Sequence, residues 1–274
     1  MALRVFKPSQ LLAPYVEAFW DYEDLLEAQS TSLSILPDTA SYLCFLYQDP
    51  LQTVHRTSVY STRSGLAGFQ SYRSDLGGFG RISGVSARLT VWGLNAFRRG
   101  VIVDCAERRV DCRDLFPGYV VERIEEDIAR LKVVEERVSY IERFLLSILN
   151  LQHEDKLIQE ACKVIRHSKG NCRISALASH FELSKRTLER RFYHHIGATP
   201  KKYARVIRLR HTLLEKTARS SWADVALDMG YYDQSHMIHD FMELYGYSPE
   251  TLHPQMPVSP TFSFSGLINL CPVQ

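Results

Sequence analysis

The sequence predicts an α+β protein: an N-terminal β-rich mixed domain with a helical extension, then a C-terminal all-α domain with two helix-turn-helix units joined by a long helix. Three observations support this fold class. Residues 3–116 are rich in aromatic side chains and punctuated by Gly and Pro, a composition typical of strands and turns. Beyond residue 118 the apolar residues recur at helical spacing. Towards the C-terminus one pattern occurs twice, 49 residues apart, which marks an internal repeat.

A chain of 274 residues is long enough for two domains that each bury a core. We expect one domain over residues 1–150, β-rich to about residue 116 and helical over 120–150. A second domain is expected over residues 154–253. Residues 254–274 form a tail whose role the sequence does not assign.

Within the first domain, alternating and β-branched residues predict strands, and Pro8–Ser9 precede a segment, Leu11–Tyr22, that we assign to a short helix. Three segments have the composition of strands: Ser41–Tyr47, Gly80–Trp92 and Gly100–Asp104.

A seam of apolar residues then follows one helical face at steps of three and four. Its members are Leu131, Val134, Val138, Ile141, Leu145 and Ile148. Such a seam either docks on the β-rich domain or pairs with its twin in a second copy of the chain. We expect the linker to the second domain near residues 150–154.

The repeat consists of two stretches with the same residue types at the same spacing. The first is Phe192, Gly197, Thr199 and Pro200; the second is Phe241, Gly246, Ser248 and Pro249. The match extends upstream, to Leu188 with Met237, Ser184 with Asp233, and, at an offset of 48, Leu177–Ala178 with Val225–Ala226. Each copy predicts a short helix, a tight turn and a second helix that ends at Gly, which is a helix-turn-helix.

Capping and turn residues set the expected helix boundaries. Ser175, Ser184, Ser221 and Asp233 are the predicted N-caps, and Gly230 the predicted turn. The helices should cover about 154–167, 175–181, 184–196, 200–216, 221–229 and 233–245.

Basic residues are concentrated in this region, although the whole chain carries a net charge of only +2. Residues 184–211 contain nine Lys or Arg side chains and one acid, Glu189. Basic charge gathered on one turn and its helices is the electrostatic footprint of phosphate contacts. The sequence therefore favours a nucleic-acid-binding domain.

In a helix-turn-helix, the second helix lies in the major groove and presents its early residues to the base edges. Arg can donate two hydrogen bonds to guanine, Gln can pair with adenine, and Glu can accept a hydrogen bond from cytosine. We therefore predict that the following residues contact bases: Arg186, Glu189, Arg190, Gln234, Ser235, His236 and His239. Phosphate contacts are predicted for Lys185, Lys201, Lys202, Arg205 and Arg208. With a rigid connector, the two helices would read consecutive grooves about 10 base pairs apart.

Residues 154–253 resemble the DNA-binding domain of the AraC-type (AraC/XylS) transcription regulators. The matching positions are Leu177-Ala178, Ser184, Leu188-x-Arg190-x-Phe192, Gly197, Pro200-x-x-Tyr203, Arg208-Leu209, Val225-Ala226, Gly230-Tyr231, Gln234-Ser235, Phe241 and Gly246-x-Ser248-Pro249. The chain departs from the family pattern at Met237, His239 and Met242, where Phe, Arg and Lys are frequent. Residues 1–150 are similar to the sensor half of a subset of these regulators.

The resemblance implies a DNA-binding transcription activator whose partners are double-stranded DNA and RNA polymerase, and the sequence leaves repression by occlusion of the promoter open. A small-molecule effector at the N-terminal domain and a homodimer are further expectations. The aromatic residues of the first domain either line an apolar pocket for an effector or are simply core residues. These residues are Phe19, Trp20, Tyr22, Trp92 and Phe97. The chain lacks a signal-peptide layout and an apolar run of roughly 18 residues, so we expect a cytoplasmic protein without membrane contact.

The sequence leaves two other functions open. A metal- or thiol-responsive regulator would use His194-His195, His236-x-x-His239, or Cys105 and Cys112. An enzyme fused to a DNA-binding domain would need a catalytic pattern. Residues 1–152 hold a single histidine and none of the nucleophile or nucleotide motifs, and a carboxylate pair among Asp21, Glu23, Asp24 and Asp38 has no supporting pattern. We therefore predict no catalytic residues, no metal ligands and no cofactor.

Overall fold

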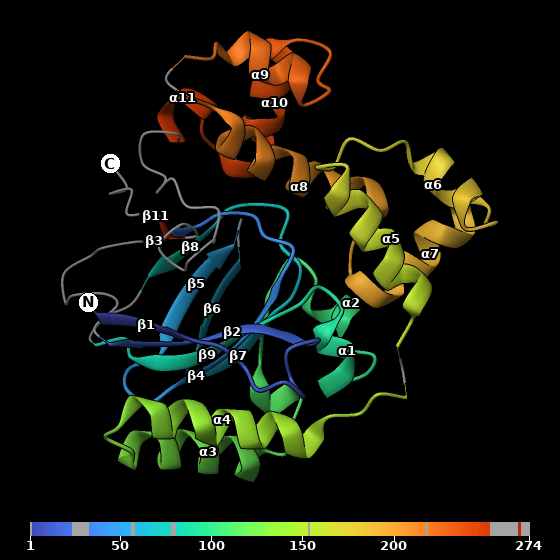
Figure 1. The fold of residues 1–274 in the computed structure, drawn as a ribbon. Helices are drawn as coiled ribbons and strands as arrows, with labels where there is room; N and C mark the ends of the chain where they lie inside the picture. The colour runs from blue at the N-terminus through green and yellow to red at the C-terminus, as the bar shows by residue number, and fades with distance from the viewer. Residues whose placement is uncertain are drawn as a thin grey trace.

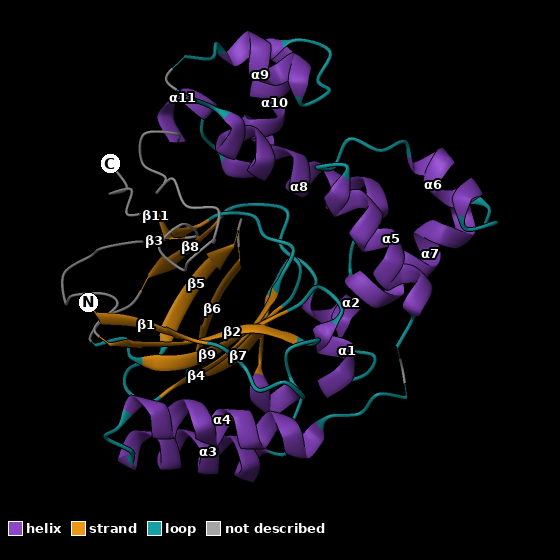
Figure 2. Cartoon of the chain, in the orientation of Figure 1, coloured by secondary structure: helices purple, strands orange, loops and turns teal. Residues whose placement is uncertain are grey.

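The computed structural model of the chain describes residues 2–23, 33–55, 58–77, 81–152, 154–217, 219–252 and 268–269. Two sheets and a helical hairpin form the N-terminal part, and helices alone form the C-terminal part (Figures 1 and 2). The predicted α+β fold class is confirmed. Within the described residues, no helix is long and apolar enough to cross a lipid bilayer.

Both sheets of the N-terminal part are antiparallel. The six-stranded sheet has the order β1 (Ala2–Phe6), β2 (Val16–Glu23), β9 (Gly84–Leu89), β4 (Ser41–Leu46), β7 (Ser64–Ala67) and β10 (Arg109–Asp111). The five-stranded sheet has the order β11 (Ile268–Asn269), β3 (Leu33–Ile35), β8 (Ser74–Gly77), β5 (Leu51–His55) and β6 (Ser58–Thr62). Because β11 pairs with β3, two residues of the C-terminal tail belong to the N-terminal domain.

One face of the six-stranded sheet is apolar. Phe19, Ala87, Leu43 and Leu66 lie opposite one another on four neighbouring strands and are all at most 2% exposed. Helices α3 (Gly118–Arg130) and α4 (Val134–Ile148) cover this face (Figure 1) and share its hydrophobic core. Burial of this core is the main stabilisation available to the N-terminal domain.

The opposite face of the same sheet, which we call the inner face, is buried yet polar. Side chains point to alternate faces along a strand, so the row Arg88, Tyr42, Ala67 and Arg109 lies across the inner face. Arg88 and Arg109 are 4% and 6% exposed. A buried polar face requires hydrogen-bond partners for its side chains.

Two of the strand and helix predictions for this domain were wrong. The segment 11–22 is not a helix: from Val16 it forms β2, whose alternate residues are buried on both faces of the sheet between β1 and β9. The segment 100–104 is not a strand. It follows helix α1 (Gly93–Phe97) and leads into helix α2 (Ile102–Cys105), which packs against the C-terminal domain. Tertiary contacts decided both segments, because short apolar runs suit either structure.

The other predicted strands agree better. Ser41–Tyr47 corresponds to β4, and the central part of Gly80–Trp92 corresponds to β9. Residue 80 lies outside the described residues.

The apolar seam lies on a helical hairpin, and not on one helix. Leu131 is the C-terminal cap of α3, and α4 begins at Val134. Val138, Ile141 and Leu145 are at most 6% exposed and belong to the core beneath the sheet. The seam therefore docks on the chain's own β-rich domain, because Leu145 is fully buried there and has no surface to offer a second copy.

The C-terminal domain consists of α5 (Lys156–His167), α6 (Ile174–His180), α7 (Lys185–Ile196), α8 (Pro200–Glu215), α9 (Trp222–Asp228), α10 (Gln234–Tyr245) and α11 (Pro249–Leu252). These bounds agree with the predicted ones to within about two residues. Ser184, Ser221 and Asp233 cap α7, α9 and α10 as predicted. Ser175 lies inside α6, whose N-cap is Arg173, so that predicted cap was wrong.

The two parts of the chain share buried surface. Phe69 and Val91 of the N-terminal part lie in the core of helices α5–α8. Leu36 lies in the core of helices α8–α10. Because both halves of the helical domain are anchored in this way, the N-terminal domain holds each of them in place.

Candidate nucleic-acid interface

The structure contains two three-helix units built to one plan: α5–α6–α7 and α8–α9–α10. Between the last two helices of each unit, the chain turns through a residue with positive φ, Glu182 at 56° and Gly230 at 73°. In both units the backbone amide of the next residue donates to the carbonyl oxygen of an alanine in the preceding helix. Leu183 donates to Ala178 and Tyr231 donates to Ala226, both at 2.9 Å. The second turn has one more residue than the first between the positive-φ residue and the N-cap of the next helix. This extra residue explains why the sequence repeat has an offset of 48 before the turn and 49 after it.

Helices α7 and α10 also begin and end alike. The side chains of Ser184 and Asp233 accept the amide hydrogens of Thr187 and His236 at the two N-termini. Gly197 and Gly246 end the helices at φ 79° and 73°, a conformation that favours glycine.

Each of these helices is anchored by the two positions that the repeat predicted. Leu188 and Phe192 on α7 are fully buried, and so are Met237 and Phe241 on α10. The remaining faces of the two helices are therefore free to carry polar side chains.

One ion pair occurs in both units with its charges exchanged. In the first unit, Arg191 on α7 binds Asp155 at the start of α5, with Nη2 2.7 Å from Oδ2. In the second unit, Asp240 on α10 binds Arg205 on α8, with Oδ1 2.7 Å from Nη2. Arg191 and Asp240 are equivalent positions, 49 residues apart, so the acid and the base have changed places between the recognition helix and the first helix of its unit.

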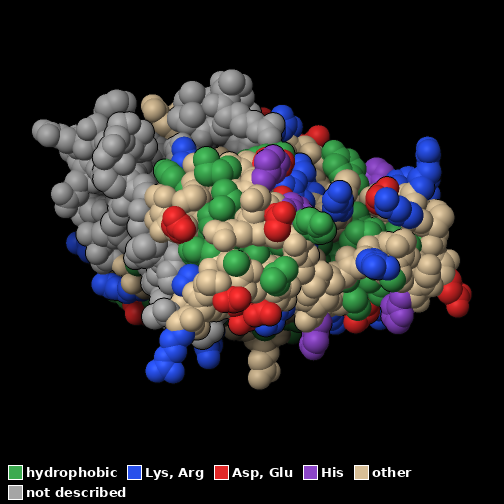
Figure 3. All heavy atoms as spheres, turned by 90° about the horizontal axis from the view of Figure 1, so that it is seen from above, with side chains coloured by type: hydrophobic (Ala, Val, Ile, Leu, Met, Phe, Trp, Pro, Cys, Tyr) green, Lys and Arg blue, Asp and Glu red, His purple; other side chains and the backbone are tan. Residues whose placement is uncertain are grey.

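The predicted base-reading residues lie on the outer faces of α7 and α10. Arg186 and Arg190 are exposed and Glu189 is partly exposed. On α10, Ser235, His236 and His239 are exposed and Gln234 is partly exposed. In Figure 3, which looks down on the helical domain, Lys, Arg and His side chains gather towards the right-hand end, where the first unit lies.

The predicted phosphate contacts fall into two groups. Lys185 and Lys201 are exposed. Lys202 instead lies 3.2 Å from Glu107 of the N-terminal domain. Arg205 and Arg208 both reach Asp240. These last three side chains have acidic partners inside the protein, so they are less available to DNA than the sequence suggested.

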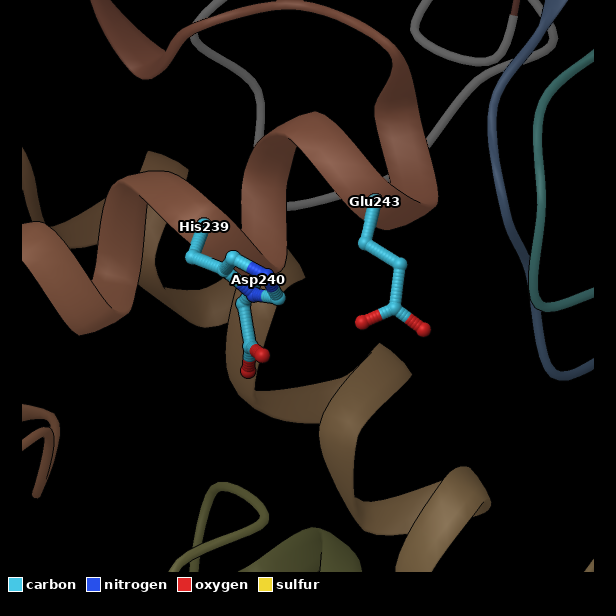
Figure 4. Close-up of side chains that lie close together, drawn as sticks. All are labelled: His239, Asp240 and Glu243. Carbon is cyan, nitrogen blue, oxygen red and sulfur yellow. The ribbon is translucent and has the colours of Figure 1, made fainter.

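His239, Asp240 and Glu243 lie close enough together to resemble a metal site (Figure 4). The guanidinium of Arg205 already lies on both carboxylates, 2.7 Å from Asp240 and 2.6 Å from Glu243. A fixed positive charge at this place opposes a cation, so the cluster acts as a helix-to-helix ion pair.

Cys105 and Cys112, the candidate thiol sensors, are poorly suited to that use. Burial raises the pKa of the Cys105 thiol to about 12 and the pKa of Cys112 well above its ordinary value. Since the thiolate is the reactive form, neither residue has the character of a sensor. Cys271 lies outside the described residues.

Asp38 links the inner face of the sheet to the connector helix α8. Its carboxylate lies 2.9 Å from Arg88 of β9 and 3.8 Å from Arg210 of α8. Burial opposes its ionisation, but the two guanidinium groups keep the pKa of Asp38 below its ordinary value. The carboxylate that was weighed as part of a catalytic pair is thus engaged in an ion network between the domains.

The N-terminal domain also holds equivalent points on the two recognition helices. The side-chain amide of Asn95 donates to the carbonyl oxygen of His195 at 3.1 Å, and the backbone amide of Arg73 donates to that of Leu244 at 2.9 Å. These two carbonyls are 49 residues apart in the repeat. Sequence reasoning missed these contacts because no local pattern marks a residue whose partner lies in another domain.

Residues 177–254 match the model of a family described as a helix-turn-helix domain. The HTH-type transcriptional activator RhaS of Escherichia fergusonii is 34% identical over 80 residues. The aligned region is 28% of this chain and 28% of RhaS, so the chain spans about a quarter of that relative's length.

Among solved structures, ToxT from Vibrio cholerae is similar with a TM-score of 0.49 at 10% identity, covering 85% of this chain and 97% of ToxT. The C-terminal domain of AraT, a response regulator from Geobacillus stearothermophilus, covers 40% of this chain and 93% of its own length, with a TM-score of 0.35 at 18% identity. With the duplicated units, the matched domain family and the related activator, residues 177–254 are similar to the DNA-binding domain of the AraC-type transcription regulators.

Proposed function

We propose that the chain is a sequence-specific DNA-binding regulator that reads two adjacent major grooves with α7 and α10. The observation that carries this proposal is the repetition of one turn, one pair of caps and one pair of buried anchors in two units. Both recognition helices keep their N-terminal halves exposed, and these are the parts that meet base edges in a helix-turn-helix. Helix α8, the first helix of the second unit, also packs into the core of the first unit, and in this way sets the spacing between the two units.

Each exposed side chain has a role in this proposal. Arg186 and Arg190 donate to guanine, Glu189 accepts from cytosine, and Gln234 pairs with adenine. Ser235, His236 and His239 complete the second base-reading surface. Lys185 and Lys201 bind phosphates and position the protein without reading the sequence.

Control would pass through the N-terminal domain, which we propose as a sensor domain over residues 1–150. Asn95, Arg73 and Asp38 contact the two recognition helices and the connector. An input that favours one arrangement of this domain would change the orientation of both reading helices together. RhaS is named an activator, and we propose activation with RNA polymerase as a partner for this chain as well.

The proposal is tested by selecting duplex fragments with the purified full-length chain and measuring affinities on a selected site and on mismatched sites. Arg186→Ala and Arg190→Ala should each cost about 1–3 kcal/mol on the selected site and relax preference at one base pair. Arg123→Ala, which removes an exposed cation of α3, serves as the control and should leave the affinity unchanged.

Two results would contradict the proposal in different ways. A uniform loss on all sequences would assign Arg186 and Arg190 to phosphates and not to bases. Failure of the unmodified chain to retain any duplex at low ionic strength would reject DNA binding altogether, since the phosphate attraction is strongest there.

A further inference from the structure

Two adjacent tyrosines in the turn between α9 and α10 lie in opposite environments. Tyr231 is 3% exposed; the guanidinium carbon of Arg208 lies 4.3 Å from the centre of its ring, and the ring meets the imidazole of His236 edge to face. Tyr232 is 87% exposed, the largest value among the exposed large apolar side chains of the described residues. Its hydroxyl has no hydrogen-bond partner in that part of the chain. A single exposed aromatic side chain needs no explanation by itself, so its position decides.

Tyr232 is the residue by which the second turn exceeds the first. Leu183 and Tyr231 occupy equivalent positions, because their backbone amides make the equivalent turn hydrogen bonds. In the first unit the N-cap Ser184 follows Leu183 directly. In the second unit Tyr232 stands between Tyr231 and the N-cap Asp233. The first unit therefore has no side chain equivalent to that of Tyr232.

The backbone on both sides of Tyr232 is held by contacts inside the second unit. Tyr231 is fixed by its buried ring. Asp233 has an extended backbone, with φ −156° and ψ 176°, and its carboxylate accepts the amide hydrogen of His236 at 2.7 Å. The extended Asp233 places Tyr232 outside the cylinder of α10, and the two fixed neighbours reduce the ordering that binding would cost.

The dimensions of B-DNA place such a residue at the wall of the groove. An α-helix with its side chains is about 10–12 Å across, and the major groove is about 12 Å wide. A helix whose N-terminal half lies in the groove therefore fills it, and the chain before the helix has to pass over one of the two sugar-phosphate strands. Gln234, Ser235 and His236 are the proposed base-reading residues of that half, and Tyr232 lies just before them. Its exposed side chain then meets the strand and not a base.

We propose that Tyr232 contacts the DNA backbone beside the groove that α10 reads: its hydroxyl donates to a phosphate oxygen, and its ring packs on the adjoining deoxyribose. This inference rests on the proposed function, since it assigns a further contact to the same interface. Tyrosine hydroxyls are among the groups that bind DNA phosphates, and such contacts fix the register of a protein without reading sequence. His239 stands where the first unit has Arg190, so an uncharged donor supplies in the second unit what fixed charge supplies in the first.

The test compares variants of the full-length chain on a duplex site selected with the parent chain. Tyr232→Phe should weaken binding about fivefold, as expected for the loss of one neutral hydrogen bond. Tyr232→Ala should weaken it further, because the ring is lost as well. Each loss should be the same factor on the selected site and on sites with one mismatched base pair. Because Tyr232 is uncharged, the slope of log affinity against log salt should not change.

Methylphosphonate substitution identifies the acceptor. Each phosphate that borders the half-site of α10 is replaced in turn by a methylphosphonate, which removes its charge and one of its oxygens. At one position the difference in affinity between the parent chain and Tyr232→Phe should largely disappear. At the other positions the difference should persist.

Two controls separate the contact from a general effect on the chain. Tyr119 is 73% exposed and belongs to α3, which lies at the opposite end of the molecule from α10 (Figure 1), so Tyr119→Phe should leave the affinity unchanged. The thermal midpoint, Tm, of the Tyr232 variants should stay within about 2 °C of the parent value, as expected for exposed positions.

The proposal is overturned if Tyr232→Ala binds the selected site as tightly as the parent chain, or if no methylphosphonate removes the difference between the parent and Tyr232→Phe. A loss confined to one base pair also overturns it, because Tyr232 would then contact a base. A larger fall in Tm overturns it too, since Tyr232 would then support the turn itself. All these outcomes leave DNA binding by the parent chain intact, whereas a parent chain that retains no duplex rejects the proposed function.

Discussion

The two helix-turn-helix units share a backbone and differ in where they place charge. In the first unit the recognition helix carries the base of the structural ion pair, Arg191, and in the second it carries the acid, Asp240. The exposed positions differ in the same sense, since Arg190 of α7 is equivalent to His239 of α10. The first unit therefore offers more fixed positive charge to DNA than the second.

This difference teaches that the repeat preserves geometry and not polarity. A turn needs positive φ and an available amide, a cap needs an oxygen, and the core needs two apolar anchors; the two units meet each of these needs. An ion pair between two helices can be satisfied in either direction. Consequently the surfaces are free to diverge while the backbone stays the same.

The largest expected effect is on the buried pair of the second unit. Asp240→Ala should lower the free energy of unfolding by about 3 kcal/mol, because it takes a buried carboxylate away from Arg208 and leaves Arg205 paired with Glu243. Arg191→Ala should cost only about 1 kcal/mol, since Arg191 is partly exposed and Asp155 keeps its cap on α5. Urea unfolding of both variants measures the difference, and equal losses would contradict this asymmetry.

The second-largest expected effect on stability distinguishes the two glycines that end α7 and α10. Gly197→Ala and Gly246→Ala share a strained left-handed backbone that costs about 1 kcal/mol. A Cβ at Gly197 would also lie 2.9 Å from Ala106 of the N-terminal domain, while one at Gly246 would meet only the side chain of Arg73 at 3.3 Å. Gly197→Ala should therefore lose roughly 1–3 kcal/mol more, and thermal unfolding of the pair checks this.

A smaller effect concerns two adjacent lysines at the start of α8. Lys201→Ala should reduce the slope of log affinity against log salt by about 1, as expected for the loss of one phosphate contact. Lys202→Ala should leave the slope unchanged, since Lys202 is paired with Glu107 of the N-terminal domain. Titrations between low and moderate salt compare the two, and an equal loss of slope would place both lysines on DNA.

The smallest effect depends on pH and again distinguishes the units. Burial lowers the pKa of His195, with Asp155 acting against the shift. Because the folded chain then binds its proton less readily than the unfolded one, the contribution to stability is full above the unfolded pKa and is lost as the pH falls below it. Its equivalent in the second unit, Leu244, cannot titrate.

When the pH is lowered from 7.5 to 5.5, we expect the urea concentration at the unfolding midpoint to decrease. The decrease should be smaller in His195→Gln. His211, whose pKa burial also lowers, should leave part of the decline in that variant. An equal or steeper decline in His195→Gln would contradict the assignment.

Local sequence signals are sufficient to predict the helical domain. Two kinds of local signal predict it: the caps at Ser184, Ser221 and Asp233, and the duplicated spacing of apolar residues. Because each signal acts over a few residues, it can be recognised in the sequence without the fold being known. The same signals placed the anchors Leu188 and Phe192, and they identified which faces of α7 and α10 would be exposed.

Only the tertiary structure decided what each charged residue does. Arg205 and Lys201 look alike in the sequence, but one is held by Asp240 and the other is exposed. Likewise, β2 is a strand because it lies between two other strands. These ion pairs join groups that are distant in the sequence and close only in the folded chain. A local sequence pattern therefore cannot predict them.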